Sequence, residues 1–370
     1  MINITYIISN INKAIAFEWI VEEIDKSKFD LSFVLLNNGD SSLEDYLIKS
    51  NIKVYRVNYV SKKNIPAAIF KICKFLINNK TDIVHTHLFD ASFCGLMAAK
   101  ICGIKKRIYT RHYSSYHHEY FPKAVKWDKV NNWLATKIIA ISSTVKEVLI
   151  AKESVPPEKI ITIYHGFKLN DFIQIKTDRL NKLSNKYNPF AKKPVIGVIS
   201  RFTELKGIQF IIPSFKMLLK NHPDALLVLF NASGDYEKNI NELLKDLPES
   251  SYSKIVFEND ITSVYHLFDV FVHVPINKTI EAFGQIYVEC MASNIPLVAT
   301  KSGIGNEILI NRENSIIVPY NDSVAIYEGI NLLLKDEQLK KQITANALNT
   351  VSEKFQLKDM IEKLERLYLR

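Results

Sequence analysis

The chain alternates between short runs of apolar residues and longer segments in which apolar residues recur every three or four positions. A short continuous apolar run is typical of a strand buried on both faces, and the longer spacing is typical of an amphipathic helix. The first half accordingly predicts strands at 4–9, 31–36, 53–57, 82–87, 106–112, 137–142 and 161–166. Helices are expected between most of them, at 13–25, 66–79, 91–102 and 143–152.

The second half repeats this pattern. Its strands are expected at 195–200, 225–230, 254–258, 270–274, 297–300 and 315–319. Its helices are expected at 207–220, 237–246, 284–293, 323–335 and 337–350, followed by an amphipathic helix at 356–370. This alternation predicts an α/β protein with two parallel, doubly wound sheets, in which ligands bind beyond the carboxyl ends of the strands.

A polar stretch rich in Asn and Lys, with two prolines, separates the halves at residues 169–194. Such a composition is typical of a linker between domains. We therefore expect an N-terminal domain at 1–168, a linker at 169–194, a C-terminal domain at 195–350 and a terminal helix at 351–370. That helix is a candidate for packing back on the N-terminal domain.

The net charge of +9 is divided unevenly. Residues 1–190 carry 28 Lys and Arg against 17 Asp and Glu, whereas residues 191–370 carry 20 against 22. The basic excess indicates an anionic partner of the first half, either nucleic acid or an anionic membrane surface. No zinc-finger spacing, RNA-binding motif or sustained basic helix supports nucleic acid.

Three further features bear on location. The N-terminus lacks the basic-then-apolar pattern of a signal peptide, and no apolar run approaches the ~20 residues that span a bilayer. The four cysteines lie far apart, without a Cys-x-x-Cys pair, and predict buried free thiols in a reducing compartment. We therefore expect a cytoplasmic protein.

The first candidate functional residues follow the strand expected at 195–200. Arg201 and Lys206 lie in the next loop, and Gly207 opens a helix. The free N–H groups and dipole at the start of that helix favour an anion, and the two cations add charge-assisted hydrogen bonds to a diphosphate. A solvated loop explains the same residues, so this spacing alone is a weak signal.

The second candidate stretch is EAFGQIYVEC, residues 281–290. Glu281 lies just ahead of a helix that begins at Gly284, and Glu289 lies on that helix. With ~1.5 Å of rise per residue and the loop added, their carboxylates lie on the order of 10 Å apart, which is about the distance from the sugar to the ribose of a nucleotide sugar. A carboxylate accepts two hydrogen bonds from vicinal hydroxyls. Ordinary surface positions would explain either glutamate alone.

The combination of these stretches resembles glycosyltransferase family 4, whose members have the GT-B fold of two facing Rossmann-like domains with a cleft between them. The resemblance covers most of the chain. It rests on Arg201-x4-Lys206-Gly207, Glu281-Ala-Phe-Gly with Glu289, PLVAT (296–300), Ser302-Gly303 with Glu307, ENSIIVPYND (313–322), DIVHTH (82–87), ASFCGLMAAK (91–100), IYTRH (108–112), and IIAISSTVKEVL (138–149) leading to ITIYHG (161–166).

The resemblance implies a role for each matching residue. Arg201 and Lys206 match the pair that neutralises the donor diphosphate and the leaving nucleoside diphosphate. Glu281 matches the acid that contacts the transferred sugar, and Glu289 matches the acid that holds the ribose. His112 matches a histidine across the cleft, near the sugar and the phosphate.

Phe283 and Gly284 match backbone donors to the sugar, and the missing side chain of Gly284 allows a close approach of the backbone. The resemblance further implies a retaining, metal-independent enzyme that moves a sugar from a UDP- or GDP-sugar to a glycan or lipid-linked acceptor. The setting would be bacterial polysaccharide or lipopolysaccharide biosynthesis. No two aspartates are separated by a single residue, so the metal-binding motif of the other major glycosyltransferase fold is absent. Cations and a helix dipole would stabilise the leaving group instead.

The sequence departs from the family at the loop after the first strand. Residues 9–17 read SNINKAIAF, without the usual paired glycines. Asn10 and Asn12 are candidates to replace them through their side-chain amides. We also place His87 and Tyr113 on the acceptor side. His85 and His87 alternate on one strand, and a cleft-lining role is favoured over a metal site because further ligands are missing.

The segment 111–129 interleaves aromatic residues with lysines, which suits an interfacial surface. We hypothesise that it touches anionic lipid or a lipid-linked acceptor at the inner face of the cytoplasmic membrane; a solvated loop is the alternative. Two other functions stay open. UDP-sugar 2-epimerases share the architecture, and a non-catalytic glycan- or membrane-binding protein could retain it. The Glu-Ala-Phe-Gly context favours the transferase.

Overall fold

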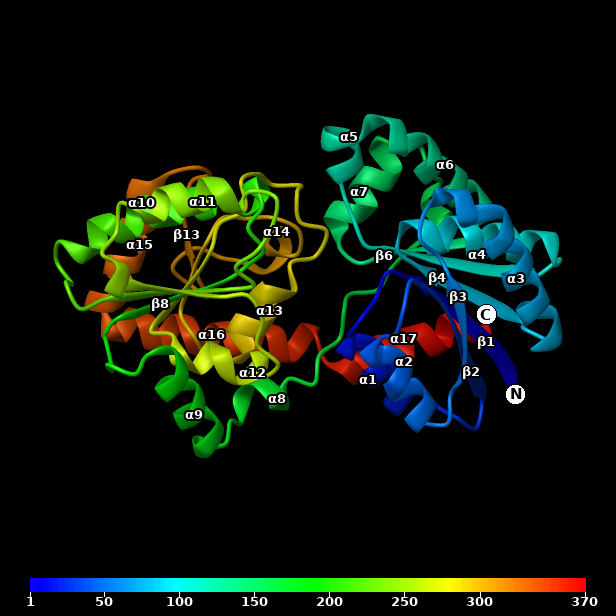
Figure 1. Cartoon of the computed structure of the whole chain (residues 1–370), viewed down its shortest axis with the longest axis horizontal. Helices are drawn as coiled ribbons and strands as arrows, with labels where there is room; N and C mark the ends of the chain where they lie inside the picture. Colours follow the sequence, from blue (N-terminus) through cyan, green and yellow to red (C-terminus); the bar gives the residue numbers. More distant parts are fainter. The chain divides into compact units, whose positions relative to one another are not determined.

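The computed structural model describes residues 1–370 and divides the chain into two compact units. The first unit comprises Met1–Phe167 and Leu357–Arg370, and the second comprises Lys168–Gln356. Each unit contains one parallel sheet with helices packed against it (Figure 1). The predicted α/β class with two parallel sheets is therefore confirmed.

The sheet of the first unit has the strand order β3-β2-β1-β4-β5-β6-β7, and every neighbouring pair is parallel. All strands predicted for this half are present. They are β1 (Ile2–Ser9), β2 (Phe29–Asn37), β3 (Lys53–Asn58), β4 (Ile83–His87), β5 (Lys106–Arg111), β6 (Lys137–Ala140) and β7 (Ile160–Thr162).

Alternate residues of β1 enter different cores, because successive side chains of a strand point to opposite faces. Ile4, Tyr6 and Ile8 pack with α1 (Ile15–Glu23), α2 (Ser42–Lys49) and α17 (Leu357–Leu369). Ile7 packs on the other face with α3 (Ile65–Asn78) and α4 (Phe89–Ile101). The helices of the remaining part are α5 (Tyr116–Tyr120), α6 (Val125–Leu134) and α7 (Ser143–Ala151).

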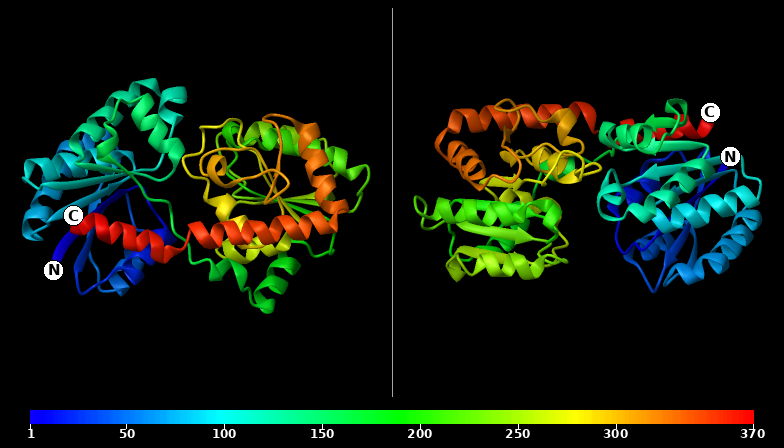
Figure 2. Two further views of the ribbon diagram at one scale, coloured as in Figure 1. Left: turned by 180° about the vertical axis from the view of Figure 1, so that it is seen from behind. Right: turned by 90° about the horizontal axis from the view of Figure 1, so that it is seen from above.

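The C-terminal helix α17 is part of the first unit, and Figure 2 shows both chain ends there. Its buried residues Ile361 and Leu364 join the β1 core. The Tyr368 hydroxyl shares hydrogen bonds with the Tyr6 hydroxyl at 2.5 Å and with His85 Nδ1 at 2.7 Å. The amphipathic helix expected at 356–370 is confirmed by α17, whereas the expected terminal segment 351–370 also contains the end of α16 (Glu337–Lys354).

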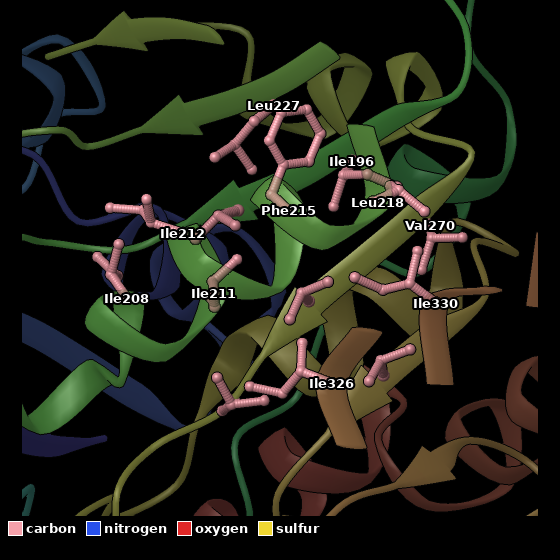
Figure 3. Packing of buried hydrophobic residues seen from close by; sticks show 14 of the residues in the cluster. Ile196, Ile208, Ile211, Ile212, Phe215, Leu218, Leu227, Val270, Ile326 and Ile330 are labelled. Carbon is pink, nitrogen blue, oxygen red and sulfur yellow. The ribbon is translucent and has the colours of Figure 1, made fainter. Parts of the chain in front are cut away.

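The sheet of the second unit has the order β10-β9-β8-β11-β12-β13. Its strands are β8 (Val195–Ile199), β9 (Leu226–Phe230), β10 (Tyr252–Ile255), β11 (Val270–His273), β12 (Leu297–Ala299) and β13 (Ile316–Ile317). Its later helices are α10 (Ile208–Leu219), α11 (Glu237–Leu244), α12 (Ile261–Val264), α13 (Gln285–Ala292), α14 (Gly305–Ile308), α15 (Ser323–Lys335) and α16. In the core, Ile211 and Phe215 of α10 pack with Ile196 of β8 and Ile330 of α15 (Figure 3).

The stretch expected to be a linker, 169–194, belongs to the second unit and is largely helical. It contains α8 (Asn170–Ile173) and α9 (Thr177–Tyr187). Leu183 of α9 is buried, and the Tyr187 hydroxyl donates a hydrogen bond to Glu258 at 2.5 Å. A few apolar residues at helical spacing are enough to pack α9 on its unit, although its overall composition is polar.

No helix is both long enough and apolar enough to cross a membrane. The four cysteines are free; Cys94 and Cys290 are buried, whereas Cys73 and Cys102 are half-buried.

Candidate functional site

The candidate donor site is built on two neighbouring strands of the second unit. β8 and β11 are adjacent and parallel, so the loops that follow them emerge at the same edge of the sheet. A backbone hydrogen bond joins the loops, from Ile276 N–H to the Leu205 carbonyl oxygen, at 3.1 Å. The predicted residues Lys206 and Glu281 follow β8 and β11, respectively, and are thereby brought together.

Gly207 makes this close approach possible. Its φ is 72°, and a Cβ atom placed on it would lie 2.0 Å from the Val274 carbonyl oxygen. A side chain is therefore excluded both by backbone conformation and by space. Helix α10 begins directly after Gly207, so Lys206 lies between the helix start and the loop after β11.

Lys206 and Glu281 form an ion pair. Lys206 Nζ donates a hydrogen bond to Glu281 Oε1 at 2.5 Å, and His273 Nε2 lies 3.4 Å from the same oxygen. Burial alone would raise the pKa of Glu281, but the Lys206 ammonium and His273 outweigh burial and hold this pKa far below its usual range. Glu281 is thus ionised at neutral pH and can only accept hydrogen bonds.

The loop that carries Glu281 rests on the loop after β12. The backbone N–H of Glu281 donates to Ser302 Oγ at 3.1 Å, and Ile304 N–H donates to the Phe283 carbonyl oxygen at 2.7 Å. A Cβ atom on Gly303 would lie 2.6 Å from that oxygen, so only glycine fits there. The Ser-Gly pair therefore sets the position of Glu281.

Helix α13 presents the second glutamate. Gly284 caps the helix with a φ of 83°, and the Phe283 side chain is buried. Tyr265 donates a hydrogen bond from its hydroxyl to Glu289 Oε2 at 2.6 Å. Burial raises the pKa of Glu289, and the Tyr265 bond opposes that shift. Arg201 is exposed, and its side chain takes no part in the Lys206–Glu281 pair.

His273 was not identified from the sequence. It ends β11, is 2% exposed, and burial lowers its pKa despite the nearby Glu281. A histidine that ends an apolar strand one loop before a candidate glutamate is the only signal that could have indicated it.

In the first unit, the predicted residue His87 ends β4, and the predicted residue His112 directly follows the neighbouring strand β5. His87 Nδ1 and His112 Nε2 share a hydrogen bond at 2.9 Å. The His165 ring stacks on His112, with ring centroids 5.7 Å apart. Burial, together with the nearby histidines, lowers the pKa of His112 to about 3.

Tyr113 is held by a buried charge network that the sequence did not reveal. Arg111, Asp128 and Glu153 are fully or almost fully buried, and Arg111 contacts both acids. The Tyr113 hydroxyl donates to Asp128, and the Arg111 guanidinium lies 3.7 Å from the centroid of its ring. The Tyr113 hydroxyl is thus bonded within this network, and the expected acceptor-side role of Tyr113 stays a prediction.

The loop without glycines is shaped by asparagines. Asn10 is exposed and has a φ of 52°, a conformation that asparagine tolerates better than most residues with a side chain. Asn12 Oδ1 accepts a hydrogen bond from the backbone N–H of Ser42 at 3.1 Å and ties the loop to α2. Asn12 Oδ1 is thus used within the fold, and the expectation that Asn10 and Asn12 offer side-chain amides to a ligand stays a prediction.

Comparison with known proteins relates both units to one family. The family model described as "Glycosyl transferases group 1" matches residues 181–350, and the model "Glycosyltransferase Family 4" matches residues 20–171. The chain is 31% identical over 313 residues to CapM of Staphylococcus aureus, named as a capsular polysaccharide biosynthesis glycosyltransferase; the match covers 81% of this chain and 80% of CapM.

Two further similarities are relevant. Over 375 residues, the chain is 24% identical to the Escherichia coli UDP-Gal:alpha-D-GlcNAc-diphosphoundecaprenol alpha-1,3-galactosyltransferase, covering 94% of this chain and 91% of that enzyme. The structure of HepE from Anabaena in complex with UDP and glucose matches with a TM-score of 0.84 and 19% identity, over 99% of both chains. At that identity the likeness to HepE concerns the fold.

Proposed function

Because the chain belongs to glycosyltransferase family 4 and is a glycosyltransferase with the GT-B fold, we propose that it moves a sugar from a nucleotide-sugar donor to a glycan or lipid-linked acceptor. The transfer proceeds with retention of anomeric configuration and without a metal. The acceptor belongs to bacterial polysaccharide assembly, since two relatives are named for capsule biosynthesis and for a diphosphoundecaprenol-linked substrate.

The ion pair between Lys206 and Glu281 is the observation that carries this proposal. The pair lies at the carboxyl ends of β8 and β11, beside the start of α10. The oxygens of a donor diphosphate placed there would attract the Lys206 ammonium. They would also accept hydrogen bonds from the free N–H groups at the start of the helix. Glu281 would exchange the ammonium for hydroxyl groups of the transferred sugar.

The positive groups have a second use in the reaction. Negative charge develops on the diphosphate as the bond to the sugar breaks, and fixed cations stabilise that charge without reorganisation. Lys206 supplies one such cation in place. Arg201 is exposed on the same loop and is free to turn toward the diphosphate. His112, from the first unit, would donate to an oxygen of the sugar or phosphate.

Glu289 would hold the ribose. Its Oε2 is bonded to Tyr265, which fixes the carboxylate on α13 and leaves further acceptor sites for the ribose hydroxyls. The UDP-galactose donor in the name of the Escherichia coli relative favours a UDP-sugar over a GDP-sugar as the donor.

The experiment is a transfer assay with purified protein, UDP- and GDP-linked sugars and a polyprenyl-diphosphate-linked sugar acceptor, run with EDTA. We expect transfer from one UDP-sugar and a product with the anomeric configuration of the donor, determined by NMR. Loss of activity in EDTA would contradict the proposal that transfer needs no metal. A product with inverted anomeric configuration would contradict the proposal of retention. Epimerisation of a free UDP-sugar without an acceptor would favour an epimerase instead.

The first unit carries a surface suited to peripheral membrane contact at the cytoplasmic inner face. We define the aromatic–lysine surface as the exposed residues Tyr116, Tyr120, Phe121, Lys123, Lys126, Trp127 and Lys129. The Tyr116 ring contacts the rings of Tyr120 and Phe121, with centroids 5.6 and 5.3 Å apart. Aromatic rings placed among lysines match the boundary between anionic head groups and acyl chains.

Vesicle flotation tests this contact. We expect binding to vesicles with anionic lipid, weaker binding to neutral vesicles, and loss of binding in the double variant Phe121→Ser/Trp127→Ser. Phe190→Ser is the matched control, since Phe190 is 84% exposed on the second unit. Equal binding to neutral and anionic vesicles would contradict the proposal.

A further inference from the structure

His87 and His112 are linked in a way that restricts both rings. His87 ends β4, and His112 directly follows the neighbouring parallel strand β5. The hydrogen bond between Nδ1 of His87 and Nε2 of His112 measures 2.9 Å. Burial lowers the pKa of His87 well below its usual value and that of His112 to about 3, so both rings are neutral near pH 7. A neutral imidazole has one N–H and one bare nitrogen. The direction of this single hydrogen bond therefore fixes the tautomer of both histidines.

The surroundings of His87 favour one direction. His87 is 5% exposed, and its Nε2 is buried without a hydrogen-bond partner. If His87 accepted the bond at Nδ1, its proton would lie on Nε2 as a buried N–H without an acceptor. Orphaned buried N–H groups are rarer in folded proteins than under-used acceptors. If His87 instead donates from Nδ1, the unpartnered atom is only a bare ring nitrogen.

The packing keeps His87 in this orientation. Its ring stacks on Tyr6 with centroids 5.5 Å apart and meets the edge of Phe17 at 4.8 Å. The next residue, Leu88, has φ 66° and ψ 166°, a region occupied almost only by glycine. Such strain persists only where the surrounding structure holds it, and it concentrates at functional sites. The end of β4 is therefore held in one conformation beside His112.

We propose that His87 is a positioning residue that holds His112 in the tautomer with its proton on Nδ1. The effect of this tautomer on sugar transfer rests on the proposed function. His112 meets the nucleotide sugar as a hydrogen-bond donor through Nδ1, and its Nε2, occupied by His87, takes no proton from the acceptor. His87 touches neither substrate in this scheme and acts through His112 alone.

The tautomer can be observed directly in the ligand-free protein. Protein labelled with ¹⁵N at its histidines is examined by two-dimensional ¹H–¹⁵N NMR, and the His112→Asn variant identifies the His112 signals. We expect His112 to carry its proton on Nδ1 in the wild type. In His87→Leu it should return to the Nε2–H form that predominates in free neutral histidine. A wild-type His112 with its proton on Nε2 would overturn the proposal, as would an unchanged tautomer in His87→Leu.

The kcat values of several His87 variants distinguish a positioning role from a merely structural one. The Asn amide can place an N–H where His87 has Nδ1, whereas Gln places its amide near Nε2. We expect kcat to fall about tenfold to a hundredfold in His87→Leu and His87→Gln, as for other residues that orient a functional histidine. His87→Asn should stay within about threefold of the wild type by restoring the donor. Equal losses in the Asn and Leu variants would overturn the proposal.

The two proposals fail in different ways. If the wild type transfers no sugar, the proposed function fails, but the NMR result on the ligand-free protein still decides the tautomer. If the wild type transfers sugar but His112 carries its proton on Nε2, only the proposed role of His87 fails.

Discussion

The Lys206 ammonium and the Glu281 carboxylate lie 2.5 Å apart, although 75 residues separate them in the chain. Each follows one of two adjacent strands, and Gly207 and Gly303 remove the side chains that would hold their loops apart. The two charges therefore neutralise each other within the site. A bound nucleotide sugar must replace this contact with contacts of its own. Lys206 and Glu281 therefore contribute both to ligand affinity and to the stability of the site.

We expect Lys206→Ala and Glu281→Ala each to lower turnover by about a hundredfold or more, since the lost transition-state contacts amount to ~3 kcal/mol. The measurement is kcat for sugar transfer, with folding checked by circular dichroism. Lys216→Ala is the matched control, because Lys216 and Asp246 form an exposed ion pair on the same unit at 3.0 Å. Near-normal kcat in both folded site variants would show that the site has been assigned wrongly.

Acid should remove the stabilisation that Glu281 contributes. Its pKa in the folded protein lies below the value of about 4.3 for an unperturbed glutamate. The contribution is thus complete above that pH and is lost as the pH falls toward the folded-state pKa. We expect the unfolding free energies of wild type and Glu281→Gln to differ at pH 7 and to converge below about pH 4. Hydrogen exchange of amides in β8 and β11 measures this in the relevant unit; a gap that widens in acid would contradict it.

Gly207→Ala should destabilise the second unit and disturb the site. Gly103→Ala is a close control, because Gly103 also has a φ of 72° but would place its Cβ with nothing within 4 Å. Gly103→Ala should cost about 1–2 kcal/mol for the left-handed conformation alone. Gly207→Ala should cost clearly more, because its Cβ clashes with the Val274 carbonyl, and should also reduce kcat by moving Lys206. Equal losses of stability in the two variants would mean that the loop after β11 shifts to accommodate the added Cβ atom at little cost.

Tyr265→Phe should weaken donor binding by roughly three- to tenfold, since removing one hydrogen bond to a carboxylate costs on the order of 1 kcal/mol. The affected quantity is the Kd for UDP, measured by calorimetry. In Tyr327→Phe, the control, the lost hydroxyl contacts only exposed Asn221, at 2.8 Å, and the Kd should be unchanged. An unaltered Kd in Tyr265→Phe would argue against a ribose role for Glu289.

Much of the fold could be predicted because parallel strands buried on both faces appear as continuous apolar runs. Segments that mix apolar and polar residues were harder. Helix α6, with the sequence VKWDKVNNWL, was not predicted, because its polar Asp128, Asn131 and Asn132 are buried. Helix α9 was taken for a linker because its composition is largely polar and Leu183 is its only buried residue.

The sequence indicated candidate residues for the site but not the contacts between them. The motifs indicated Lys206 and Glu281 separately, as ligands of a diphosphate and a sugar. Their mutual bond depends on β8 lying next to β11 in the sheet, which the order of strands along the chain does not reveal. The contacts of Asn12 and Tyr113 were not predicted for the same reason, since their partners Ser42 and Asp128 come from other elements.

Helix α17 gives the first unit an unusual dependence on the order of synthesis. A ribosome finishes residues 1–167 early, yet the partner of Tyr6 and His85 is Tyr368, made after the whole of the second unit. The nascent first unit must therefore wait, with part of its apolar β1 face uncovered, while a complete neighbour folds. Ribosome stalling or truncation before residue 357 would yield a chain whose later-made unit is intact and whose earlier-made unit is exposed to chaperones and proteases.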